Sequence, residues 1–238
     1  MEQALTAVFF KWDSADLLNA VQLLTTQEGD TPAGSVPTIG MFIRTAAEKD
    51  PAAAAAMFAG LPESARGPLR TELLGALSGE SLAAAVRAVP ETQWTAADGH
   101  TFGQDPGKNA ALVASLPETP AAGKARRQFA EEWAVRDPEA AVSWVQTLPV
   151  SHGAQESARG ITQGWAGYDD VAASAWAATL PPGPAHDGAA AGLVVALAKR
   201  DPESAQEWAQ SIAAEDVRGE VLRLLEPAAS RSRKGGTP

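Results

Sequence analysis

The sequence predicts an all-α fold, an α-α superhelix (solenoid) of about seven helical hairpins with a period near 32 residues. Two observations predict it: an alanine-rich composition, and an internal repeat whose copies carry the same signals for the start and end of a helix. About a fifth of the 238 residues are alanine, which is the strongest helix former and a weak strand former. The composition therefore disfavours an all-β fold, and the repeat indicates how the helices are organised.

The internal repeat is clearest in the second half of the chain. Three segments align without gaps: residues 133–149, 165–181 and 197–212. Their aspartates, Asp137, Asp169 and Asp201, are 32 residues apart, and a Leu-Pro pair follows eleven residues after the first two. Asp50 and Asp105 begin segments with the same signals. We therefore expect units that start near residues 13, 50, 78, 105, 137, 169 and 201.

Each unit is expected to begin with a helix. Asp137 suits the N-cap, because its carboxylate accepts free backbone N–H groups, and a proline at the next position loses no helical hydrogen bond. Apolar residues then follow at helical spacing: Ala141, Trp144, Val145 and Leu148. Proline disfavours helical geometry at the residue before it, so the Leu-Pro pair ends this first helix.

A second helix is expected in each unit after a polar loop. In the unit that starts at Asp169, the loop covers residues 181–187 and the helix covers Ala189–Lys199, with basic residues at the negative end of its dipole. Large aromatic residues such as Trp133 and Trp144 lie on successive helices. One hairpin cannot bury both faces of its helices, so neighbouring hairpins must stack, and alanine at the contact positions lets their backbones approach closely.

Stacked hairpins form one expected domain. It is a single α-solenoid over residues 1–229, followed by a disordered tail over 230–238 that is short, polar and glycine-rich. The units that start near residues 13 and 78 lack the Asp-Pro pair, so we expect their hairpins to be irregular.

The aligned segments share the pattern W-A-x-x-D-P-x-x-A-x-x-W-x-x-x-L-P, which is specific over residues 133–212 and fair over 46–62 and 105–117. This pattern resembles that of bacterial helical-repeat proteins, mostly uncharacterised, that carry many such copies in tandem. Those proteins are similar in architecture to tetratricopeptide and HEAT arrays. The resemblance implies an α-α superhelix and a role in protein–protein interaction, and it implies no catalytic residues.

Composition and charge narrow the expected partners. The chain has no cysteine, which excludes disulfides and thiolate metal sites. Its formal net charge of −10 disfavours nucleic acid, because lysine and arginine carry the affinity for phosphate. No apolar stretch approaches the roughly 18 residues of a spanning helix, so we expect no membrane insertion. We expect a soluble chain, with the cytoplasm favoured over an exported or anchored fragment.

No motif for a cofactor or a nucleophile is present. The sequence lacks G-x-G-x-x-G, G-x-x-x-x-G-K-[ST] and G-x-S-x-G, so we expect no cofactor. His152 and His186 fall in equivalent expected loops, where they could form a metal site or a pH-sensing edge. No second ligand accompanies them at metal spacing, which favours solvated loop histidines and no metal.

The candidate ligand or partner contacts are Trp94, Asp98, His100 and Phe102. They lie in residues 91–104, where a glycine-broken connection is expected in place of a second helix. An aspartate, a histidine and two aromatics in one irregular stretch could form a ligand pocket or an acid/base pair. The alternative, which we favour, is a decayed repeat whose aromatics cover the exposed core.

The leading functional hypothesis is a non-catalytic protein–protein interaction scaffold that binds a peptide or helix on its concave face. It rests on architecture, and a fold does not by itself determine a function. One alternative is an enzyme or an enzyme-accessory domain with its site in residues 91–104, around Asp98 and His100. Another is a structural spacer or self-assembling array, so self-association is also open.

Overall fold

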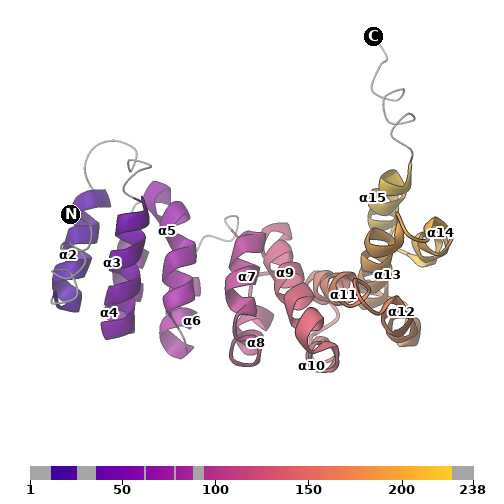
Figure 1. The fold of residues 1–238 in the computed structure, drawn as a ribbon, viewed down its shortest axis with the longest axis horizontal. Helices are drawn as coiled ribbons and strands as arrows, with labels where there is room; N and C mark the ends of the chain where they lie inside the picture. Colours follow the sequence, from indigo (N-terminus) through magenta and orange to yellow (C-terminus); the bar gives the residue numbers. More distant parts are fainter. Residues whose placement is uncertain (1–11, 26–35, 62, 78, 88–93, 227–238) are drawn as a thin grey trace, which may run out of the picture. The chain divides into compact units, whose positions relative to one another are not determined.

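The structure is a computed structural model that describes residues 12–25, 36–61, 63–77, 79–87 and 94–226 (Figure 1). Over these ranges the chain forms fourteen helices and no strand, which confirms the predicted all-α class. No helix in the described ranges is both long and apolar enough to cross a membrane. The expected tail over residues 230–238 lies outside the described residues.

The helices belong to two compact units, Met1–Phe102 and Gly103–Pro238. The bounds in the first unit are α2 (Ser14–Thr25), α3 (Val36–Lys49), α4 (Pro51–Gly60), α5 (Glu63–Ala76), α6 (Gly79–Arg87) and α7 (Ala96–Gly103, which ends at the boundary). Those in the second are α8 (Pro106–Ala114), α9 (Pro120–Arg136), α10 (Pro138–Val145), α11 (His152–Trp165), α12 (Asp170–Thr179), α13 (Pro184–Leu197), α14 (Pro202–Ser211) and α15 (Glu215–Leu225). The single domain over 1–229 stays a prediction.

Within each unit the helices alternate between two layers. In the N-terminal unit α2, α4 and α6 contact one another in sequence, and α3 packs on α5. In the C-terminal unit α9, α11 and α13 form one layer. In the other layer, α10 contacts α9 and α11, and α12 contacts α11 and α13. We call α2, α4, α6, α8, α10, α12 and α14 the first helices, and α3, α5, α7, α9, α11, α13 and α15 the second helices.

Aspartate precedes every first helix except α6, as predicted. The Asp137 carboxylate accepts the backbone N–H of Ala140 at 3.0 Å. Asp50, Asp105, Asp169 and Asp201 accept from the residue three positions on at 2.9–3.3 Å. At the other end of α12, Leu180 precedes a proline and is extended, with ψ 135°. These signals act within a few residues of one another, so the sequence alone reveals them.

The core of the C-terminal unit contains the predicted pairing of aromatics from successive helices. The ring centroids of Trp133 in α9 and Trp144 in α10 lie 5.7 Å apart, and Phe129 packs edge-on against both. Trp165 and Trp176 form the equivalent pair at 6.5 Å. Trp144 and Trp176 are 7% and 8% exposed, so each fills space inside its hairpin.

Glycine, rather than the expected alanine, makes the closest contacts between second helices. A Cβ atom on Gly160 of α11 would lie 2.1 Å from the Arg127 carbonyl oxygen of α9. A Cβ on Gly188 of α13 would lie 1.9 Å from the Gln155 carbonyl oxygen of α11. Each of these glycines belongs to a G-x-x-x-G pair on its helix. Only a residue without a side chain permits this approach, because the neighbouring atoms are backbone.

The residue before four of the capping aspartates donates a hydrogen bond to an earlier segment of the same unit. In the C-terminal unit the acceptors are carbonyl oxygens at the end of the preceding second helix, where main-chain oxygens have no helical partner. The donor–acceptor pairs are Arg136–Gly103, Tyr168–Ala134 at 3.0 Å and Arg200–Ala166 at 2.6 Å. In the N-terminal unit Lys49 donates to the Trp12 oxygen from the same repeat position. One contact therefore recurs at one place in the repeat.

Two expected loops are helical in the structure. Residues 96–103 form α7, with Gly99 inside it, where we expected a glycine-broken connection. The second helix of the unit at Asp169 begins at Pro184 instead of Ala189. Gly183 precedes it with φ 149°, a conformation that favours glycine, and the proline then fits the first turn. His186 and His152 consequently lie in first turns of helices and not in loops.

Candidate functional site

Asp98, the acid among the predicted contacts, is fully buried and is paired within the N-terminal unit. Its Oδ1 accepts Nε of Arg70 from α5 at 2.8 Å. Its Oδ2 accepts the backbone N–H and the hydroxyl of Thr95 at 2.7 and 2.8 Å. The Thr95-to-Asp98 spacing is that of a capping box, which explains why α7 starts at residue 96. Both oxygens thus have structural partners.

The other predicted contacts separate into buried and exposed residues. Trp94 is 3% exposed and Phe102 is fully buried, with ring centroids 6.1 Å apart. His100 is exposed. Residues two apart on a helix do not face each other, so α7 does not direct Asp98 and His100 at a common atom. This geometry favours aromatics that cover the core, and a ligand role for the four residues stays a prediction.

Two more buried charged side chains, Arg126 and Asp187, make hydrogen bonds to the main chain of loops in the C-terminal unit. Arg126 is 1% exposed and donates to the carbonyl oxygens of Leu116 and, at 3.0 Å, Pro117. Burial lowers the pKa of its guanidinium, against the opposing effect of Glu118. Asp187 accepts the backbone N–H groups of Ala213 and Ala214, at 3.0 and 2.9 Å, and so caps the start of α15. These groups hold helix ends in place.

A row of polar side chains lies on three second helices of the C-terminal unit, α9, α11 and α15, and the sequence prediction did not include it. Its members, the polar row, are Arg127 and Glu131 of α9, Glu156, Arg159 and Gln163 of α11, and Glu220 of α15. Three contacts link them: Arg127–Glu156 at 3.6 Å, Arg159–Glu220 at 2.8 Å and Gln163–Glu131 at 3.2 Å. The repeat alignment carries a signal, because Arg127 and Arg159, like Glu131 and Gln163, are 32 residues apart.

Burial and the neighbouring polar groups shift the pKa of two carboxyl groups of this row, Glu131 and Glu220, in opposite directions. Burial raises the pKa of Glu131, although Arg127 and the bond from Gln163 oppose the shift. The hydrogen bond from Arg159 lowers the pKa of Glu220, against partial burial. Arg159 is 5% exposed, whereas Arg127, Glu131 and Gln163 are partly exposed. The row therefore combines two ion pairs, each with one largely buried and one more exposed partner, with other polar groups that are partly exposed.

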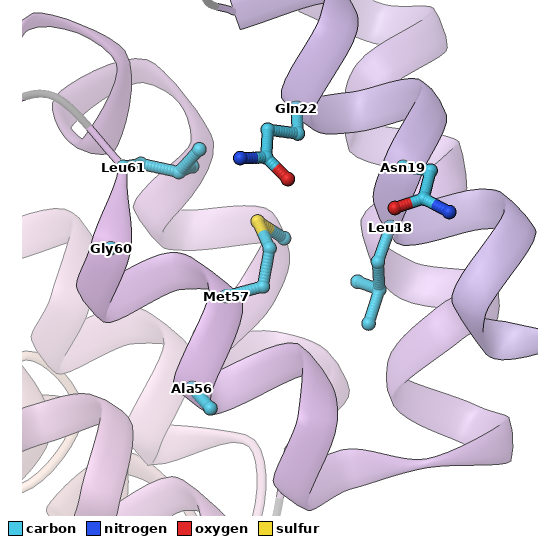
Figure 2. A pocket seen from close by; sticks show the side chains of 7 residues that line it. All are labelled: Leu18, Asn19, Gln22, Ala56, Met57, Gly60 and Leu61. Carbon is cyan, nitrogen blue, oxygen red and sulfur yellow. The ribbon is translucent and has the colours of Figure 1, made fainter.

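A small pocket lies between the first helices α2 and α4 of the N-terminal unit (Figure 2). Its volume is about 280 Å³. The lining has an apolar part and a polar part, made of Leu18, Ala56, Met57, Gly60 and Leu61 and of the amides of Asn19 and Gln22. Figure 2 shows the side chains of Gln22, Met57 and Leu61 directed into the space between the two helices. The sequence prediction did not include this pocket.

Within the described residues no group of three or more histidine and acidic side chains is placed to hold a metal ion. Comparisons of the chain with protein-family models, curated proteins and solved structures give no match.

Proposed function

We propose that the protein is a non-catalytic interaction scaffold. In this proposal the chain is an α-solenoid of about seven hairpins, and a peptide or helix of another protein lies on the concave face that its second helices form. The resemblance to bacterial helical-repeat proteins, and through them to tetratricopeptide and HEAT arrays, supports the proposal by analogy. The stronger support comes from contacts within the chain.

Contacts that recur at fixed repeat positions support the solenoid. The aspartate caps, the bond from the residue before each cap, and the glycine contacts between second helices each return in successive hairpins. A hairpin that donates from the same repeat position to the same place on its predecessor stacks in one orientation. Repetition of one stacking step generates a superhelix.

The polar row is the observation that carries the binding proposal. It places partly exposed Arg127, Glu131 and Gln163 side by side on adjacent second helices, linked by contacts of 3.2 to 3.6 Å to one another or to Glu156. An extended peptide has donors and acceptors along its main chain, and amide and carboxylate side chains in a row match them. Arginine adds a charge-assisted bond to an acidic group.

Selection from a displayed random-peptide library tests this proposal without a known partner. A selected peptide is then titrated against the full chain and against Glu131→Lys and Gln163→Ala. We expect each substitution to weaken binding by about tenfold, the change that corresponds to about 1.4 kcal/mol. Circular dichroism confirms that the variants remain helical.

The same substitutions on a first helix provide matched controls. Glu139→Lys and Gln146→Ala alter exposed residues at the two ends of α10, and we expect peptide affinity to stay within about twofold of the original. Peptides that bind all four variants equally would show that the polar row is not the binding face. A library that yields no saturable peptide would contradict the scaffold proposal itself.

A further inference from the structure

The pocket between α2 and α4 coincides with a departure from the repeat. The seventh residue after the capping aspartate is tryptophan in three units, Trp144, Trp176 and Trp208, and methionine in the unit that starts at Asp50, as Met57. Trp144 and Trp176 are almost fully buried, whereas Trp208 and Met57 are only partly buried. The pocket therefore lies beside the position where other units place an indole ring.

In the C-terminal unit one buried indole at this position, that of Trp144, makes a hydrogen bond to the preceding first helix, whereas the buried Nε1 of Trp176 has no hydrogen-bond partner among the described residues. Trp144 of α10 reaches the preceding first helix, α8, and its Nε1–H donates to the Ala110 carbonyl oxygen at 3.2 Å. Ala110 is five residues after its capping aspartate, and Leu18 of α2 is five residues after Asp13. Asp13 is also a cap, because it accepts the backbone N–H of Asp16 at 2.8 Å. The Leu18 carbonyl oxygen thus has the repeat position of an indole acceptor.

We propose that the α2–α4 pocket binds an indole ring, carried by a tryptophan of a partner polypeptide. The ring lies among Leu18, Met57 and Leu61, and its N–H donates to the Leu18 carbonyl oxygen. The volume suffices, because a dry cavity of about 150 Å³ holds benzene and this pocket measures about 280 Å³. The Met57 thioether is an adaptable partner for an aromatic ring.

The rim of the pocket indicates a ring attached to a chain. Asn19, Gln22, Ala56 and Gly60 are exposed, so the ring enters from the surface (Figure 2). The two amides stand at this opening and supply donors and acceptors for a peptide main chain. A Cβ atom on Gly60 would meet nothing within 4 Å, which leaves room for the chain beside the ring. This site is in the N-terminal unit and does not depend on the polar row.

Methionine-methyl NMR measures this binding directly, because the chain has three methionines and Met57 is assigned by Met57→Leu. Four probes are titrated: indole, N-acetyl-tryptophanamide, a short Gly/Ser peptide with one tryptophan, and the same peptide with leucine instead. We expect a saturable shift of the Met57 methyl signal with the tryptophan probes, while Met1 and Met41 stay unchanged. The tryptophan peptide should bind at least about tenfold more tightly than indole.

Each other outcome overturns a defined part of the proposal. Indole that binds as tightly as the peptide would indicate a small aromatic ligand and not a polypeptide. A leucine peptide that binds equally well would remove the indole preference. A Met57 signal that stays unmoved up to about 10 mM of every probe would show that the pocket binds no such ring. None of these outcomes bears on the peptide selection that tests the polar row.

Met57→Trp introduces the residue found at this position in three other units and gives an independent test. We expect it to fill the pocket, raise the melting temperature by about 2 °C or more, and abolish binding of the tryptophan peptide. Ala59→Trp, at an exposed position of the same helix, should leave both properties unchanged. Gly60→Leu should narrow the pocket without a clash, because a Cβ at this position meets no atom within 4 Å. It should therefore weaken binding of the tryptophan peptide while α4 stays helical. Peptide binding that survives both pocket variants would refute the assignment.

Discussion

Gly188→Ala tests the close contact between α11 and α13. A Cβ at this position would lie 1.9 Å from the Gln155 carbonyl oxygen, and Cβ atoms essentially never approach another heavy atom closer than 3.0 Å. The two helices must therefore separate by about 1 Å, and the obstacle is helix backbone, which has no alternative rotamer. Overpacking of a core costs about 1–3 kcal/mol, and we expect the upper end of that range.

The matched control is the same substitution where space is free. A Cβ on Gly219 of α15 would meet nothing within 4 Å, so Gly219→Ala should stabilise the protein by about 0.5–1 kcal/mol through helix propensity alone. Urea titration and thermal melts followed by circular dichroism measure both variants. At roughly 3 °C per kcal/mol, Gly188→Ala should lower the melting temperature by about 6–9 °C and Gly219→Ala should raise it slightly. A Gly188→Ala protein that melts at or above the parent temperature would refute the close packing.

Three further substitutions test the core, the buried ion pair and the polar row. Trp144→Ala should cost about 3–5 kcal/mol in urea titration because it opens a cavity beside Phe129, and a melting shift below about 1 °C would contradict its place in the core. Arg70→Ala leaves the carboxylate of Asp98 buried without its cation, so we expect a loss of about 3–5 kcal/mol; a loss below about 1 kcal/mol would mean that Asp98 is solvated. Because the Glu220 pKa is lowered in the folded state, its contribution to stability is present above the unfolded value of about 4.3 and is lost as the pH falls. The stability difference between the parent and Glu220→Gln should therefore shrink between about pH 6 and pH 3, and a constant difference would show that the lowered pKa has no effect on folding.

The elements that the sequence predicted correctly depend on neighbours in the chain. An aspartate cap, a proline in the first turn and apolar residues at helical spacing involve residues within two turns, so the first helix after Asp137 could be predicted from its own residues. The errors arose where local signals conflict. Gly99 suggested a break at residues 96–103, yet the capping box of Thr95 and Asp98 starts a helix there, and Arg70 from another helix stabilises its acid.

The candidate site divides in the same way. The sequence predicted a candidate site because four residues suited to binding or catalysis lie close together in the chain: Trp94, Asp98, His100 and Phe102. The packing of α5 and α7 buries Asp98 and Phe102 and gives them structural roles, whereas His100 stays exposed. The α2–α4 pocket has only a partial signal in the sequence, because Met57 stands where three other units have tryptophan. The alignment does not show that a pocket results, since that depends on how far α2 stands from α4.

The sequence by itself determined that this protein is helical, where most first helices begin, and that its hairpins share one pattern, because caps, propensities and periodicity act over a few residues. Only the tertiary structure decided which residues form the contacts between hairpins. Glycine rather than alanine sets the spacing of α9, α11 and α13, and Gln163 and Arg159 of the polar row meet partners that are 32 and 61 residues away in the chain. Such contacts depend on the angle and distance between helices, and packing over the whole unit determines those quantities.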